Sequence, residues 1–338
     1  METLYEYAGK MMQESINHYF ELVEQTENFT TFDEDSFREE YAKQMILAGK
    51  SQEYLGLTQE QCLDAVERVS AIPFDIEKGV SAFVYENSRL HIEKLIAEAR
   101  RITDGFSKID ADEIKARPYL LPIWQAALNI SSKSNLKTIF GSASDQNISG
   151  PSSLKIANYA ESYFEKNVIS DIQIKERTER TLEGIVRDLV GRMLYEAIVK
   201  DALDKAGVPY LPEEDYNGIE GVVYKFRADF VIPNEKAPLA FIEVRKSSSR
   251  HASLYAKDKM FSAINWKGKH KKMLGIVVAE GEWTNESLAS MAKVFDYVVP
   301  VSKSKDLAEK IKRYLEGDES ILKWIIDFEI HENKVEEK

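Results

Sequence analysis

The order of helices and strands expected in the second half of the chain constrains its fold more than any other feature of the sequence. A long helical pattern covers 178–206, and three β-prone runs follow it. Helical and strand-like runs then alternate at 253–266, 274–280, 285–295, 297–301 and 305–315. This order predicts a mixed sheet flanked by helices, within an α/β (α+β) protein.

The first part of the chain is expected to be helical to about residue 130. Four stretches place apolar residues at helical spacing, at 4–25, 37–49, 58–69 and 88–102. Residues 131–153 are rich in Ser, Asn and Gly, which indicates a linker or long loop. The predicted organisation is a helical domain at 1–130, a linker at 131–153 and a sheet-containing domain at 154–338.

Composition excludes several classes of protein. A single cysteine rules out an intramolecular disulfide, and the five histidines show no paired zinc spacing. The sequence has no signal peptide and no apolar run long enough to span a bilayer, so we expect a cytoplasmic protein. The net charge of −12 argues against indiscriminate binding of nucleic acid, yet residues 227–272 carry eleven basic and four acidic side chains. This local excess is suited to a polyanion.

Two carboxylates fall within the second and third β-prone runs, VVYKFRADFVI at 222–232 and LAFIEVR at 239–245. Alternation of side chains places Asp229 on one face of its strand and Glu243 on one face of the next. The intervening PNEKAP is a suitable turn between antiparallel neighbours, so the two acids are expected to meet. One or two carboxylates, completed by water and phosphate, form the kind of site that Mg²⁺ prefers.

This pattern resembles the PD-(D/E)XK nuclease superfamily, to which many type II restriction endonucleases belong. The resemblance covers about 178–301 and implies a restriction-endonuclease-like core. It implies that Asp229 and Glu243 hold magnesium and that a glutamate on the preceding helix supports the metal. Glu196 and Glu183 both match that glutamate, and we favour Glu196 because it lies where the helix becomes apolar.

The chain departs from the family where a lysine is expected two residues after the second acid. Arg245 stands there, and arginine stays charged, so it can stabilise an anion but cannot act as a base. Arg245 can replace the lysine electrostatically, Lys246 can reach the site through a bulge, or Lys257 or Lys259 can supply the ammonium group from the next helix. We favour Arg245. A structural ion pair between Glu243 and Arg245 is the alternative without catalysis.

The resemblance implies a magnesium-dependent endonuclease that cuts duplex DNA at a specific sequence, acting as a homodimer because the two strands are related by a two-fold axis. Catalysis is assigned to Asp229, Glu243, Arg245 and Glu196. DNA contacts are expected from Lys246, Arg250, His251, Lys257 and Lys259. The alternatives are a non-catalytic DNA-binding protein on a degenerate nuclease scaffold and a DNA repair nuclease.

Overall fold

The structure is a computed structural model that describes residues 1–25, 61, 76–248 and 251–331. The chain forms two compact units, Met1–Val190 and Gly191–Lys338. The predicted helices at 37–49 and 58–69 lie outside the described residues. In the part of the chain that the structure describes, no helix has both the length and the apolar character needed to span a membrane.

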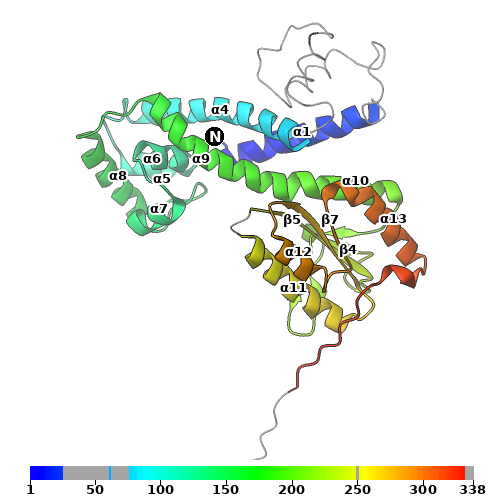
Figure 1. Cartoon of the computed structure of the whole chain (residues 1–338). Helices are drawn as coiled ribbons and strands as arrows, with labels where there is room; N and C mark the ends of the chain where they lie inside the picture. The colour runs from blue at the N-terminus through cyan, green and yellow to red at the C-terminus, as the bar shows by residue number, and fades with distance from the viewer. Residues whose placement is uncertain (26–60, 62–75, 249–250, 332–338) are drawn as a thin grey trace, which may run out of the picture. The chain divides into compact units, whose positions relative to one another are not determined.

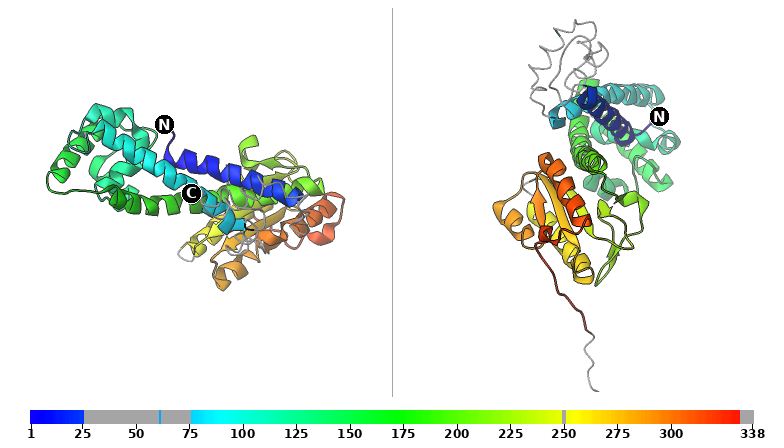
Figure 2. Two further views of the ribbon diagram at one scale, coloured as in Figure 1. Left: turned by 90° about the horizontal axis from the view of Figure 1, so that it is seen from above. Right: turned by 90° about the vertical axis from the view of Figure 1, so that its right-hand side faces the viewer.

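The N-terminal unit is helical throughout its described residues. Its α-helices are α1 (Leu4–Gln25), α4 (Ile76–Ile102), α5 (Ala111–Ala116), α6 (Leu121–Ala127), α7 (Lys133–Phe140), α8 (Gly150–Phe164) and α9 (Asp171–Leu189). Helices α1 and α4 pack side by side, and α9 contacts both of them (Figure 2). Helix α8 packs against α5, and α6 packs against α9. The predicted helical character of this region is confirmed where it is described.

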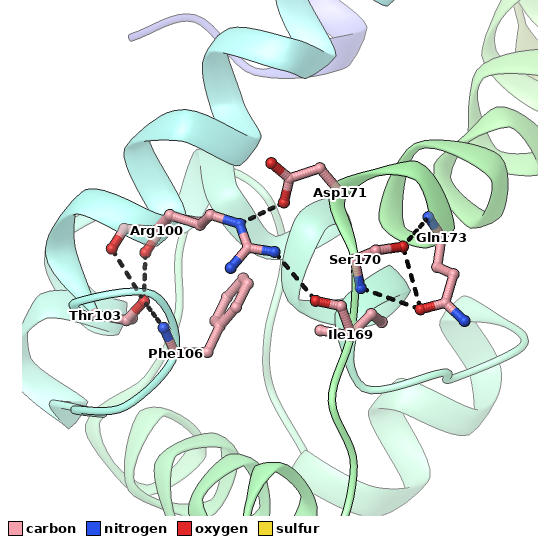
Figure 3. A network of polar contacts seen from close by, with 8 residues as sticks. Arg100, Thr103, Phe106, Ile169, Ser170, Asp171 and Gln173 are labelled. Atoms are coloured by element: carbon pink, nitrogen blue, oxygen red, sulfur yellow. Dashed lines mark hydrogen bonds and ion pairs between the residues drawn. The ribbon is translucent and has the colours of Figure 1, made fainter.

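Polar contacts fix the start of α9 against the end of α4 (Figure 3). The Nη2 atom of Arg100 donates a hydrogen bond to the Ile169 carbonyl at 3.1 Å, and its Nε atom pairs with Asp171. Ser170 and Gln173 form a capping box in which each side chain accepts from the backbone of the other. The direction of α9 is therefore set at its first turn.

The C-terminal unit contains a five-stranded mixed sheet, as the sequence predicts. Its strands are β1 (Leu211–Pro212), β4 (Phe230–Ile232), β5 (Ala240–Ser247), β6 (Leu274–Gly281) and β7 (Tyr297–Val299), in the order β1-β4-β5-β6-β7. The pairs β1–β4 and β4–β5 are antiparallel, whereas β5–β6 and β6–β7 are parallel. A separate two-stranded sheet joins β2 (Ile219–Glu220) and β3 (Lys225–Phe226).

Helices cover both faces of this sheet (Figure 1). They are α10 (Tyr195–Ala206), α11 (Ala252–Lys269), α12 (Asn285–Met291) and α13 (Ser304–Leu315). Consecutive side chains of β5 point to opposite faces of the sheet, as strand geometry requires. Arg245 lies over the Tyr255 ring of α11, and Lys246 lies over the Tyr195 ring of α10. The core between the sheet and α11 includes Val231, Phe241, Ala256, Ala263 and Trp266.

The division into units differs from the predicted domains. The structure divides the chain at 190/191 rather than at 153/154, because α8 and α9 pack on helices of the N-terminal unit. Residues 131–153 contain α7 and the start of α8, and they bury Leu136, Phe140 and Ile148. They therefore belong to the packed structure of that unit, where a linker or long loop was predicted.

The predicted strand at 222–232 is interrupted before β4. The hydroxyl of Tyr216 accepts a hydrogen bond from the Ala228 N–H at 2.6 Å and donates one to the Ala228 carbonyl at 2.7 Å. Both backbone groups of Ala228 are satisfied by a side chain instead of a neighbouring strand. The residues before Ala228 therefore pair with β2, and those after it join the main sheet.

Candidate active site

Asp229 and Glu243 meet at the pair of strands that the sequence predicts. Phe230 pairs with Ile242 across β4 and β5, so Asp229 lies directly before β4 at the level of Glu243. The backbone N–H of Val244 donates to Asp229 Oδ2 at 2.6 Å. This bond holds the Asp229 carboxylate against β5, next to Glu243.

A lysine from α11 contacts Glu243. The Glu243 side chain is 1% exposed, and its Oε2 atom accepts a hydrogen bond from Lys259 Nζ at 2.5 Å. Lys259 is itself buried, with a side chain 10% exposed. The other carboxylate oxygen, Oε1, is buried and has no hydrogen-bond partner among the described residues. Glu243 therefore binds the Lys259 ammonium through Oε2, and its Oε1 atom can accept a further ligand.

Burial dominates the ionisation of both acids. Burial raises the pKa of Glu243 from 4.5 to about 7, against the lowering effect of the Lys259 charge. Burial also raises the pKa of the Asp229 carboxyl, while the hydrogen bond from Val244 lowers it. Asp229 further raises the pKa of Glu243, as expected for two like charges. Burial and the neighbouring Asp229 charge therefore both favour the protonated form of Glu243, and the positive charges of Lys259 and Arg245 oppose this effect.

Arg245 lies beside the acids without contacting them directly. Its guanidinium is 5.0 Å from the centre of the Tyr255 ring, and its buried Nε has no hydrogen-bond partner among the described residues. Its charge lowers the pKa of both Asp229 and Glu243. Within the described residues Glu243 forms its ion pair with Lys259 and none with Arg245, so the structural pair considered from the sequence is not formed.

Arg245, Lys246, Lys257 and Lys259 were considered as the source of positive charge, and of these Lys259 contacts a candidate metal ligand, Glu243. Lys246 lies on the opposite face of β5, over Tyr195, as its place in the alternation predicts. Lys257 is exposed on α11. The preference for Arg245 as the replacement for the family's lysine is therefore not supported by the contacts.

Glu196 lies on α10 and is electrostatically coupled to the site. Burial raises its pKa from 4.5 to about 8, and Asp229 is the next largest cause. Glu183, the other candidate, is exposed and belongs to the N-terminal unit. Glu196 does not join the two acids in a metal cage, because the described residues contain no cluster of three or more His, Cys, Asp or Glu side chains suited to a metal.

The residues predicted to touch DNA have different environments. His251, the N-cap of α11, and Lys257, on that helix, are exposed, so a phosphate can reach them. Lys259 is buried and pairs with Glu243, and its contact with DNA stays a prediction. Lys246 is half-buried, and Arg250 lies outside the described residues.

One sequence signal could have identified Lys259. Positions 252, 256, 259, 263 and 266 of α11 recur at helical spacing, and they are buried in the structure. All are Ala or Trp except Lys259. A lysine within an apolar stripe needs a buried anion, and Glu243 on the adjacent strand supplies it.

Comparisons with known proteins do not extend these assignments. No protein-family model matches the sequence, and no curated protein or solved structure is similar enough to count as a match. The chemistry of the site therefore has to be inferred from its own residues.

Proposed function

We propose that the C-terminal unit is a magnesium-dependent endonuclease that hydrolyses phosphodiester bonds in duplex DNA. One observation carries the proposal: the half-buried Asp229 carboxylate, directly before β4, lies beside the buried Glu243 carboxylate of β5, and the Lys259 ammonium is 2.5 Å from Glu243. Two acids and a lysine converging on one sheet are unusual in a core, because each buried charge has a large desolvation cost. Functional sites are where such perturbed groups gather.

The residues fit a divalent metal ion. Asp229 and Glu243 would hold it, since Glu243 Oε1 is a buried carboxylate oxygen with no partner among the described residues. Magnesium is commonly bound by one or two carboxylates, with waters and substrate phosphates completing its shell. When bound, it would lower the pKa of its water and neutralise charge on the phosphate.

The side chains of the chain itself would act on charge and position. Lys259 holds Glu243 through its hydrogen bond, and its ammonium group would stabilise negative charge that develops on a phosphate bound at the acids. Arg245 can stabilise the same charge through its guanidinium, but it cannot accept a proton. Glu196, with a pKa of about 8, can carry a proton near neutral pH beside Asp229.

We further propose a sequence-specific enzyme of the type II restriction class that acts as a homodimer. Two copies related by a two-fold axis are the simplest way to cut both strands of a symmetric site. The exposed Lys257 lies on the helix that carries Lys259, and the exposed His251 is the N-cap of that helix, so both are suited to hold phosphates next to the acids. Sedimentation of the protein with and without DNA would measure the dimer.

A plasmid digest tests the proposal. The full chain should cleave supercoiled plasmid with Mg²⁺ and leave it intact with EDTA, and discrete fragments would indicate sequence specificity. A smear would indicate non-specific cleavage and favour a repair nuclease. Intact plasmid in Mg²⁺, together with retained DNA binding, would favour the non-catalytic DNA-binding protein.

A further inference from the structure

The N-terminal unit contains a cleft of about 400 Å³ that the proposed chemistry does not use. Its wall is formed by the end of α6, the start of α7, part of α9 and Tyr5 of α1. Among the described residues that line it, three are cationic, Lys133, Arg177 and Arg180, and one is acidic, Asp188. This composition is unexpected in a chain whose net charge is −12.

The cations of the cleft have no ion-pair partner among the acids that the structure describes. Within the described residues, Lys133, Arg177 and Arg180 form no ion pair with a carboxylate. The carboxylate of Asp188 instead accepts a hydrogen bond from the Tyr5 hydroxyl at 2.9 Å. Three like charges around one cleft repel one another, and an anion bound between them would relieve that repulsion.

The cleft is also held in shape. Arg177 Nη1 donates to the Ala126 carbonyl at 3.1 Å, which fixes the guanidinium at the wall and leaves its other donors for a ligand. Arg180 follows three residues later on α9, so both arginines lie on one side of that helix. The first turn of α9 is anchored by Arg100 and Asp171 (Figure 3). Little reorganisation would therefore be needed on binding.

We propose that this cleft binds a phosphate group, and that the backbone of duplex DNA supplies it. Arginine presents planar donors that match phosphate oxygens, and lysine adds a point charge. Ser132 and Lys133 lie at the N-terminus of α7, where the backbone amides of the helix favour an anion. The site depends on the proposed function only for its choice of DNA as the source of the phosphate.

A matched pair of double variants tests the site. Lys133→Ala/Arg180→Ala removes two exposed cations of the cleft, and Lys108→Ala/Lys166→Ala removes two exposed cations that do not line it. Binding of a mixed-sequence duplex would be followed by fluorescence anisotropy in EDTA at several salt concentrations. Adenosine monophosphate, titrated by calorimetry into the same proteins, is the probe for a free nucleotide.

The two cleft cations should contribute about two phosphate contacts, so the wild type should bind DNA more tightly than the cleft variant, and their affinity ratio should fall about tenfold between roughly 50 and 200 mM salt. The control variant should keep the wild-type salt dependence. Unchanged duplex binding with loss of adenosine monophosphate binding would support the phosphate site and assign it to a free nucleotide. If neither probe separates the cleft variant from the control, the site is refuted. Plasmid cleavage is a separate readout, so a cleft effect without cleavage would refute only the nuclease.

Discussion

Replacing Lys259 by Met should show how strongly the buried charge of Glu243 depends on its partner. The Lys259 and Glu243 groups are 2.5 Å apart and buried, and near pH 8.5, where Glu243 is ionised, removing one partner of a buried ion pair costs about 3–5 kcal/mol in unfolding free energy. Lys257→Met is the matched control, because Lys257 is exposed on the same helix and should change stability by about 0.5 kcal/mol at most.

The sign of the pH dependence makes this prediction specific. Without Lys259 the pKa of Glu243 should rise above its present value of about 7, so the folded variant holds a proton that the unfolded chain releases above about pH 4.5. Its stability should therefore fall as pH rises, and the loss relative to the wild type should be greater near pH 8.5 than near pH 6. Urea unfolding at the two pH values measures this difference.

A second substitution separates charge from packing. Adding Glu243→Gln to Lys259→Met removes the unpaired charge, so the double variant should be more stable than Lys259→Met alone near pH 8.5. Equal losses for the Lys259 and Lys257 variants, or a loss that does not change with pH, would refute the assignment of a buried ion pair.

Three further outcomes follow from the C-terminal unit. Without metal, the free energy of unfolding should fall as pH rises from about 4.5 to about 8, because over this range Glu196 stays protonated only in the folded chain. Glu196→Gln should make that fall smaller, as measured by urea unfolding at several pH values. Lys267→Met should lower the free energy of unfolding by about 3–5 kcal/mol, because Asp296 is left charged and buried; thermal unfolding measures this loss. Gly221→Ala should lower the free energy of unfolding by about 1–3 kcal/mol, as measured by urea unfolding. A Cβ at this position would lie 1.9 Å from Asn265 Nδ2, and Asn265 cannot move away freely because it is hydrogen-bonded to the backbone of Val223 and Tyr224.

The main sheet was largely predictable because its central strands have local signals. Residues 240–244 and 274–278 are continuous apolar runs apart from Glu243, as expected for strands buried on both faces. The proximity of Asp229 and Glu243 followed from alternation and from the short turn between their strands. These features depend on residues close together in the sequence.

The remaining features depend on tertiary contacts that no local pattern specifies. The strand at 222–232 is broken by the hydroxyl of Tyr216, six residues before that run begins. Residues 154–190 join the N-terminal unit because of the helices they pack on. Lys259 reaches Glu243 because α11 packs on β5, whereas the sequence favours Arg245 only by its position in a short motif.

Single-turnover cleavage of supercoiled plasmid by Asp229→Asn, in saturating Mg²⁺, tests the central claim most directly. Asn keeps the size of the side chain and an oxygen that can accept from the Val244 N–H, but it removes the charge that would hold the metal. We predict that the variant retains DNA binding and that its cleavage rate falls at least about a hundredfold, the scale expected when one electrostatic contribution to the transition state is removed. Cleavage at the wild-type rate would contradict the metal site, and Glu243 would then be the buried structural partner of Lys259.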